Sequence, residues 1–475
     1  IDAFFQEFFG FEQKIAMRVY DAAGNELPYQ YLTLRRDQQM FRRPLRKFPS
    51  VEFRHELDIS VPLRIPAYGY TTIVCRPVKN EPTRHLGSMA VDDHTIENEH
   101  LRVSVNPNGT LTLTDKRSGQ VYDRLLTLED CADIGDGWFH GIAVSDRVYS
   151  SIACPADVSL SCDGIAKATL TVRVTMNVPA EFDFARMVRS DRLAPLVVTH
   201  HVTLRKGATS VEVKTVVENT IRDHRLRLLL PTGAQTDTYL ADQVYDVVER
   251  PIALRKDFDA AYYKELEVET RPQQSWTAVH DAKRGLAVVS VGLRESAVRD
   301  QPERPIALTL LRSFIKAVMT PGNEGGQIQG QHTFDYRIVP LQGEPDVVEL
   351  FRESELLAAG VRWYAIESLT ATGDEVGRTF QRDLPPEKSF LSIDAERAVV
   401  TAIHRRTADE LATIRVFNPT SESDEVRVSL ADAKVAARLT DLEGRPGDPL
   451  PVEGGQVKAP LAPRKILTVR LDEAG

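Results

Sequence analysis

The chain contains few cysteines, four in 475 residues, at Cys75, Cys131, Cys154 and Cys162. None of them forms a CxxC pair. So sparse a set argues against a disulfide-stapled scaffold and a cysteine-type zinc site. We therefore expect scattered free thiols and a cytoplasmic location.

Long hydrophobic runs and an excess of positive charge are also missing. The longest apolar stretches, such as Gly285–Leu293, have the length of a strand, whereas a membrane-spanning helix needs about 18 residues. The 59 Lys and Arg residues are outnumbered by 68 Asp and Glu, giving a formal net charge of −9. This composition disfavours nucleic-acid and membrane partners. Because the sequence starts at Ile1 without a signal peptide, we expect it to begin partway through a longer gene product.

Sequence motifs of several reaction centres are absent. The sequence has no GxGxxG, GxxxxGK[ST], GxSxG or HExxH motif. The only adjacent histidines are His200 and His201, which would point to opposite faces of a strand. These observations predict neither a catalytic set nor a metal site within this chain.

The dominant pattern is alternation of apolar and polar residues over strand-length segments. Residues 101–105 alternate, a turn follows at Asn106–Gly109, and residues 111–114 alternate again, which predicts a hairpin. Similar patterns occur at 168–175, 197–204 and 210–217. Short connections between these segments favour antiparallel pairing. The predicted fold is mainly β, with stacked antiparallel β-sandwiches, one of them unusually large, and few helices.

Only one segment has the pattern of a helix, Asp346–Ala359, preceded by Pro345 and followed by Gly360. Polar stretches with proline near residues 79–88 and 370–390 suggest domain boundaries. We predict three domains: a small sandwich at 1–87, whose start is truncated if the chain is a fragment, a large sandwich at 88–370, and a small C-terminal sandwich at 371–475.

One loop, residues 133–141, combines acids, glycines, aromatic residues and a histidine. Its indole, Trp138, could stack on the C–H face of a sugar, and Asp136 could accept hydroxyl protons. The carboxylates Glu129, Asp130, Asp133 and Asp136 crowd together, as the paired acids of a glycosidase do, although solvated loop acids explain them equally well. We therefore regard Trp138 and Asp136 as candidate sugar-binding residues, with packing of the loop on its own domain as the alternative.

Three further stretches are unusual. Arg225 and Arg227 would share one face of a strand, where they could bind hydroxyl or carboxylate groups or form an ion-pair patch. Arg250 ends the stretch Val247–Pro251, and a Gly/Gln-rich loop covers Gly322–His332.

Together and in this order, these stretches resemble the C-terminal β-rich half of glycoside hydrolase family 38, the α-mannosidases, and its bacterial branch in particular. The matching segments are Glu97–Val103 with Asn108–Leu111, Glu129–Asp136, Asp223–Arg227, Asp246–Pro251, Pro321–Tyr336 and Arg415–Thr420. The resemblance extends over nearly the whole chain.

The resemblance implies a retaining exo-α-mannosidase, acting on terminal α-mannosides. It also implies a zinc ion and an aspartate nucleophile in an N-terminal catalytic domain, followed by a helical domain. No His-x-Asp zinc pair occurs in this chain, so both would lie outside it. In the family, the β-rich half lends an aromatic residue and an arginine to the rim of the active site. Trp138 matches the aromatic position, usually Tyr, and Arg250 matches the arginine.

Two alternatives stay open. A mannosylglycerate hydrolase of the same family would use the arginines for a carboxylated substrate. A carbohydrate-binding or purely structural β-sandwich protein would need no catalytic domain. Homo-oligomer formation is also open. The aromatic cluster Phe4, Phe5, Phe8 and Phe9 is a candidate for part of an apolar contact face, with a local core as the alternative.

Overall fold

The computed structural model describes residues 16–42, 50–78, 85–257, 267–315, 325–364, 384–431 and 433–474. Strands dominate these ranges, which contain one α-helix, α2 (Val347–Ala359), and one 3-10 turn, Ser151–Ala153. The paired strands run antiparallel. The prediction of stacked antiparallel β-sandwiches is thus confirmed. No helix in the described ranges has the length and hydropathy needed to cross a membrane. The cluster at Phe4–Phe9 lies outside the described residues.

The N-terminal region consists of small sheets. The first sheet has the order β2-β1-β6, and a separate two-stranded sheet is the hairpin β3-β4. A further strand, β5, pairs with β29, which leads into the C-terminal region. The bounds of these strands are β1 (Ala16–Tyr20), β2 (Glu26–Leu27), β3 (Gln30–Arg42), β4 (Ser50–Ser60), β5 (Gly69–Thr71), β6 (Val74–Val78) and β29 (Glu387–Ser389).

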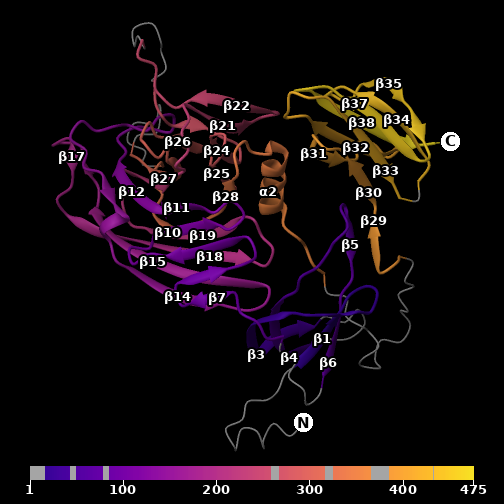
Figure 1. Cartoon of the computed structure of the whole chain (residues 1–475), viewed down its shortest axis with the longest axis horizontal. Helices are drawn as coiled ribbons and strands as arrows, with labels where there is room; N and C mark the ends of the chain where they lie inside the picture. The colour runs from indigo at the N-terminus through magenta and orange to yellow at the C-terminus, as the bar shows by residue number, and fades with distance from the viewer. Residues whose placement is uncertain are drawn as a thin grey trace, which may run out of the picture.

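The central region contains three large sheets (Figure 1). The five-stranded sheet has the order β11-β10-β9-β8-β7, with β7 (Ala90–Asp92), β8 (Thr95–Glu97), β9 (Leu101–Val105), β10 (Leu111–Asp115) and β11 (Gln120–Leu125). The six-stranded sheet has the order β13-β12-β20-β27-β26-β23, with β12 (Thr127–Ala132), β13 (Tyr149–Ser150), β20 (His224–Leu230), β23 (Arg271–Pro272), β26 (Glu295–Val298) and β27 (Ile306–Ser313).

The third central sheet has nine strands in the order β14-β15-β18-β19-β28-β25-β24-β21-β22. Its members are β14 (Ala156–Cys162), β15 (Lys167–Pro179), β18 (Leu193–Arg205), β19 (Val211–Asn219), β21 (Thr238–Gln243), β22 (Asp246–Pro251), β24 (Trp276–His280), β25 (Gly285–Ser290) and β28 (Gly330–Leu341). A small hairpin, β16 (Phe182–Asp183) with β17 (Val188–Arg189), lies beyond the end of β15.

A continuous apolar core fills the space between these sheets. Every second side chain along most of β15 is buried, including Leu170, Val172, Val174 and Met176. These side chains belong to the main core cluster, which also contains residues of the other two sheets. Each such side chain contributes roughly 1.5–3 kcal/mol of transfer free energy. The period-two pattern read from the sequence therefore sets which face of each strand packs inward.

One row of polar side chains crosses this core. The Nδ1 atom of His200 lies 2.8 Å from the Thr215 hydroxyl, which lies 2.7 Å from the Tyr336 hydroxyl. His200 is fully buried, while its neighbour His201 points to the other face and contacts Thr171. The two histidines therefore cannot share a ligand, as predicted.

The C-terminal region is a sandwich of a four-stranded and a five-stranded sheet with its own core. Their orders are β30-β33-β37-β36 and β31-β32-β38-β34-β35. The bounds are β30 (Leu391–Asp394), β31 (Val399–His404), β32 (Glu410–Phe417), β33 (Asp424–Leu430), β34 (Val435–Thr440), β35 (Pro446–Leu450), β36 (Val452–Glu453), β37 (Gln456–Leu461) and β38 (Ile466–Glu473).

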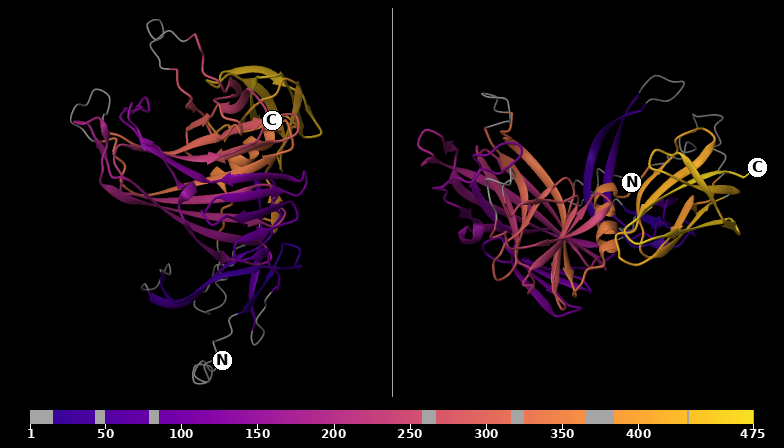
Figure 2. Two further views of the ribbon diagram at one scale, coloured as in Figure 1. Left: turned by 60° about the vertical axis from the view of Figure 1, so that its left-hand side comes forward. Right: turned by 90° about the horizontal axis from the view of Figure 1, so that it is seen from above.

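Helix α2 stands between the central sheets and the C-terminal sandwich (Figures 1 and 2). Phe351 on this helix makes edge-to-face contacts with Trp276 of β24 and Phe417 of β32. These three residues belong to one cluster that joins the two regions. The helix thus packs the two regions against each other.

Predictions of local structure agree with the structure where turn and helix-cap residues determine the ends of an element. Strand β9 pairs with β10 in the predicted hairpin, with Leu101 opposite Asp115. The helix starts one residue later than predicted because Asp346 is its N-cap. The domain boundaries at 87 and 370 stay predictions, since residues 79–84 and 365–383 are outside the described ranges.

Candidate functional site

The loop at residues 133–141 follows β12 and is folded around the buried carboxylate of Asp133. This carboxylate accepts hydrogen bonds from the backbone N–H groups of Gly135 and Gly141, each at 3.0 Å, and from Nε of Arg312 at 2.7 Å. Arg312 also donates to the carbonyl oxygens of Asp136 and Phe139, at 2.8 and 2.6 Å. One arginine therefore fixes the loop to strand β27.

Two glycines are required in this loop by close backbone approach. A Cβ atom at Gly135 would lie 2.0 Å from the Phe139 carbonyl oxygen, and one at Gly141 would lie 2.2 Å from the Gly135 nitrogen. At Gly137 the nearest atom would be 4.0 Å away, so that position is open. The loop is therefore a tightly closed structure whose tip is free.

The candidate residues Trp138 and Asp136 both lie near this tip. The Asp136 carboxylate accepts hydrogen bonds from the backbone N–H groups of Trp138, at 2.8 Å, and Phe139, at 3.1 Å. This shapes the turn that presents Trp138, whose side chain is 72% exposed. The indole is available to a ligand, while one oxygen of Asp136 has a role in shaping the loop.

The third candidate, Arg250, lies on β22 and lines a pocket of about 320 Å³. Its Nη1 donates to the Pro272 carbonyl at 2.8 Å, and no carboxylate pairs with it among the described residues. The pocket also presents Tyr239, Glu267, Glu269 and Arg271. Burial raises the pKa of Tyr239, and the nearby Arg250 opposes that rise.

A buried ion-pair network underlies the pocket. Arg227 donates to Glu129 through Nη2 at 2.6 Å and to Glu269 through Nη1. Arg299 donates to the second oxygen of Glu129 at 2.7 Å. Burial alone would raise the pKa of Glu129, but Arg227 and Arg299 more than offset it and hold that pKa below its usual range. Glu129 is therefore kept ionised, whereas a general acid needs a carboxyl group that carries a proton.

Arg225 shares a face with Arg227, as predicted, but its surroundings differ. It is buried and donates to the Thr270 hydroxyl at 3.3 Å, while its Nε has no hydrogen-bond partner in the described part of the chain. Burial and the neighbouring Arg227 lower its pKa. The nearby acid Asp223 hydrogen-bonds Gln327 and does not pair with Arg225. Among the described residues, the ion-pair patch therefore forms at Arg227 and not at Arg225.

On the opposite face of β12, Asp130 joins three elements. It pairs with Arg189 of β17 and with Nδ1 of His224, the latter at 2.5 Å. The other ring nitrogen of His224 lies 3.0 Å from Oδ1 of Asn219, an oxygen that also accepts from the Ile221 backbone N–H. The acids at 129–136 are thus engaged by arginine, histidine or backbone groups.

The loop and the pocket are linked by a short polar path. Arg312, which holds the loop, lies 3.5 Å from Glu295. Glu295 is paired across the sheet with Pro272, and the Pro272 carbonyl receives the Arg250 hydrogen bond. Trp138 thus lies on a loop that follows β12 of the six-stranded sheet, and Arg250 lies on β22 at the edge of the nine-stranded sheet, where it contacts β23 of the six-stranded sheet through the Pro272 carbonyl.

Sequence reasoning missed Arg312, Glu269 and Tyr239. Arg312 interrupts an apolar strand at a position that faces Arg225 across the ladder, and that break in the pattern was its only signal. The Gly/Gln-rich stretch is described from Gly325 on, and there Gln327 and Gln329 brace residues 221–223 and Ser313.

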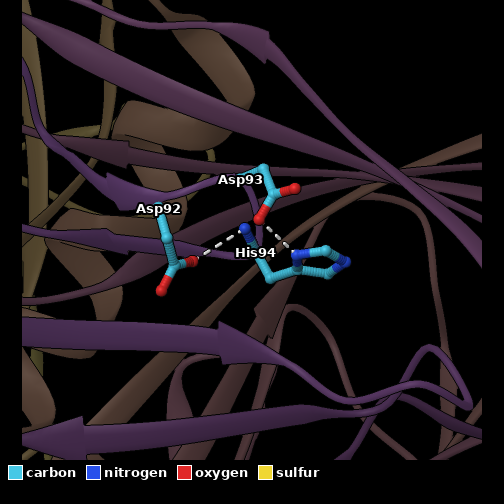
Figure 3. Close-up of side chains that lie close together, drawn as sticks. All are labelled: Asp92, Asp93 and His94. Carbon is cyan, nitrogen blue, oxygen red and sulfur yellow. Dashed lines mark hydrogen bonds and ion pairs between the residues drawn. The ribbon is translucent and has the colours of Figure 1, made fainter.

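One group of described residues, Asp92, Asp93 and His94, has potential metal-ligating atoms within 4.8 Å of one another (Figure 3). These residues are consecutive and exposed, and their hydrogen bonds are local. Asp92 accepts from the His94 backbone N–H at 2.9 Å, and Asp93 lies 2.6 Å from Nδ1 of His94. With one imidazole already engaged and no surrounding support, the group does not fit a zinc site.

Comparison with known proteins identifies the class of this fold. An α-mannosidase from Enterococcus faecalis V583 superposes with a TM-score of 0.81 over 98% of this chain and 52% of that chain, at 23% identity. A glycosyl hydrolase family 38 protein from Enterococcus faecalis gives a TM-score of 0.79 over 97% of this chain and 53% of that chain, also at 23% identity. The fold is therefore the multi-sandwich architecture found in these larger chains.

The sequence comparisons find the same family. Residues 96–319 match "Glycosyl hydrolases family 38 C-terminal domain". A Halalkalibacterium halodurans protein described as "Putative mannosylglycerate hydrolase" is 25% identical over 460 residues, which are 91% of this chain and 47% of that protein. Residues 96–319 are therefore similar to the C-terminal domain of glycosyl hydrolase family 38, in agreement with the resemblance seen in the sequence. It spans about half the length of the relatives it matches.

Proposed function

We propose that this chain is the C-terminal β-rich half of a retaining α-mannosidase-like glycosidase that hydrolyses terminal α-mannosides. The observation that carries the proposal is the match to a family 38 C-terminal domain in a chain about half as long as its relatives. In this proposal the nucleophile, the zinc ion and the helical domain belong to the remaining half. The cysteine content supports our further proposal of a cytoplasmic location.

The proposed role of the site is to complete the rim of the sugar pocket. Trp138 offers an exposed ring on a loop held by Arg312, and Arg250 offers a guanidinium whose own hydrogen bond goes to a backbone carbonyl. A ring and a cation on fixed supports suit a polyhydroxylated ligand, because little conformational entropy is lost on binding. Asp136 is proposed to act with them through its second oxygen.

The surface beside this loop supports contact with the remaining half. Ile142, Val144 and Val148 follow Trp138 along the chain and are all exposed. Clustered exposed apolar side chains of this kind indicate an interaction surface. We propose that the other half covers this segment and that the interface places Trp138 at the sugar site.

The proposal is tested with the full-length polypeptide and with residues 1–475 alone. With zinc supplied, the full-length protein should release 4-nitrophenol from the α-mannoside, and residues 1–475 should not. Turnover by residues 1–475 alone would contradict the assignment of chemistry to the other half.

A matched pair of tryptophan variants tests the rim. Trp138→Ala in the full-length protein should lower kcat/KM by about tenfold or more, the loss expected for one stacking contact. Trp363→Ala removes a ring that is 83% exposed elsewhere on the chain and should leave kcat/KM unchanged. Equal effects of the two changes would remove Trp138 from the site.

A mannosylglycerate hydrolase is the second candidate. The description of the Halalkalibacterium halodurans relative favours it. So does Arg250, which has no carboxylate partner in the described part of the chain, because such a guanidinium suits a carboxylated aglycone. A comparison of kcat/KM for mannobiose and mannosylglycerate separates the two, and Arg250→Gln should then affect mannosylglycerate more. A non-catalytic carbohydrate-binding protein would instead bind manno-oligosaccharides as residues 1–475 alone, which calorimetry would detect.

A further inference from the structure

Another pocket, of about 380 Å³, lies on the five-stranded sheet of the C-terminal sandwich (Figure 1). Its floor is one face of that sheet, where His404 of β31 lies opposite Thr413 of β32, and Arg415 of β32 lies opposite Thr468 of β38. The intervening residue Ile414 belongs to the core of the sandwich, so this face points outward. The turn after β34 forms a wall of the pocket. The volume falls in the range of roughly 300–1,000 Å³ that is typical of small-molecule sites.

Two guanidinium groups are held side by side in this pocket. Nη1 of Arg406 donates to the Glu443 carbonyl at 2.6 Å, and Nη2 of Arg415 donates to the Leu442 carbonyl at 3.4 Å. Because these carbonyls belong to consecutive residues, the two cations are fixed next to each other. Nε of Arg415 donates to the Thr468 hydroxyl at 3.1 Å. In the described part of the chain, the partners of both guanidinium groups are therefore neutral oxygens, and most of their N–H donors stay available to a ligand.

The acidic side chains around the pocket are engaged elsewhere. The Asp441 carboxylate accepts a hydrogen bond from the Arg445 backbone N–H at 2.8 Å and lies 3.7 Å from Nη1 of the same arginine. Glu443 pairs with Arg445 as well. The buried carboxylate of Glu410 lies 3.8 Å from Nε of Arg470. No carboxylate among the described residues thus forms an ion pair with either guanidinium group in the pocket.

A glycine allows this arrangement. Gly444 has a φ of +82°, and a Cβ atom at this position would overlap Nη1 of Arg406. Gly455 has a similar φ of +79°, but a Cβ atom there would meet nothing within 4 Å. Position 444 therefore needs glycine for two reasons, its left-handed backbone and the close approach of the arginine, whereas position 455 needs it for the first reason only.

We propose that this pocket binds a phosphate group, either free or carried by a small organic molecule, through Arg406 and Arg415. Two adjacent cations repel each other, and an anion bound between them turns that repulsion into attraction. A tetrahedral phosphate offers oxygens in several directions and can accept from two guanidinium groups at once. The inference is independent of the proposed function, because it uses no residue of the loop at 133–141 or of the Arg250 pocket.

Calorimetric titration of the full-length polypeptide tests the proposal with three probes: inorganic phosphate, glucose 6-phosphate and glucose. Glucose 6-phosphate should bind once per chain with a Kd of about 1 mM or tighter, and glucose should give no saturable heat. The hexose is deliberately not mannose, so that the probe does not report on the proposed mannoside site. Tighter binding of glucose 6-phosphate than of inorganic phosphate would assign the pocket to an organic phosphate, and equal binding would assign it to free phosphate. No binding of either anion, or equal binding of glucose, would overturn the proposal.

Arginine variants assign the binding to this pocket. Arg406→Gln and Arg415→Gln should each weaken phosphate binding by about tenfold or more, because each removes one charged donor group. The control Arg427→Gln removes an arginine of β33 on the other sheet of the sandwich, where it pairs with Glu425, and should leave binding unchanged. Unchanged binding in both pocket variants would overturn the proposal.

A matched pair of glycine variants separates the pocket from general stability. Gly444→Ala and Gly455→Ala place a side chain on the same left-handed backbone, so thermal unfolding should be affected similarly by the backbone strain. Only Gly444→Ala displaces Arg406, and it should weaken phosphate binding by about tenfold or more, while Gly455→Ala should bind as the unmodified protein does. Equal binding by the two variants would contradict the role of Arg406.

Discussion

At the scale of single residues, burial of imidazoles makes stability depend on pH. Burial lowers the pKa of His200 from 6.5 to about 3, and His201 adds to the effect. Burial, followed by Arg225, lowers the pKa of His140 to about 4. Both side chains are therefore neutral in the folded protein, whereas in the unfolded chain they bind a proton once the pH falls below 6.5.

The expected consequence is a loss of stability on acidification. Above pH 6.5 neither histidine lowers the free energy of unfolding. As the pH falls from 6.5 towards the pKa of the folded state, each histidine lowers the free energy of unfolding by up to about 1.4 kcal/mol per pH unit. Urea unfolding between about pH 6.5 and 5.5 measures the slope, above the range in which ordinary carboxylates titrate. His200→Gln should flatten it, and the exposed His94→Gln should not. A pH-independent stability in that interval would contradict the prediction.

A second prediction at this scale concerns Arg312. Its side chain and that of Asp133 are both buried and joined at 2.7 Å. Arg312→Ala would leave the Asp133 carboxylate without its counter-ion and should lower the free energy of unfolding by about 3 kcal/mol. The comparison variant Arg427→Ala breaks an exposed ion pair with Glu425 and should cost less than about 1 kcal/mol. Equal losses in urea unfolding would show that Arg312 does not hold the loop.

At the scale of elements, the loop at 133–141 depends on glycine at particular positions. Gly135→Ala would place a Cβ atom 2.0 Å from a carbonyl oxygen, so the loop must open, at a cost of about 1–3 kcal/mol. Gly137→Ala adds the same methyl group where the nearest atom is 4.0 Å away and should be tolerated. Thermal unfolding and limited proteolysis of the loop compare the two. Similar behaviour would contradict the described loop geometry.

The elements also show how far sequence reasoning reaches. Strand alternation and turn residues predicted the hairpin of β9 and β10, and the flanking Pro345 and Gly360 helped to predict α2, because the determining residues are close in sequence. The pairing of side chains that are far apart in the sequence could not be predicted. Arg227 pairs with Glu129, some hundred residues away, rather than with a nearby acid, because β12 and β20 are neighbours only after folding. The same limit hid the contacts of Arg312 with the loop at 133–141.

At the scale of the whole molecule, one aromatic residue joins two regions. Phe351 contacts Trp276 of the central sheets and Phe417 of the C-terminal sandwich. Phe351→Ala should cost about 3–5 kcal/mol and separate unfolding into two transitions, since each region keeps its own core. Leu356→Ala changes an exposed residue of the same helix and should retain the original transition. Calorimetry distinguishes these outcomes, and a single unshifted transition for Phe351→Ala would contradict the prediction.

The cluster of Phe351, Trp276 and Phe417 also constrains how the protein can diverge. A change of ring size at any one of the three positions alters a volume shared by two regions that otherwise pack separately. Substitutions there should be retained only in compensating combinations, so across homologous sequences these positions should covary although they lie up to 141 residues apart.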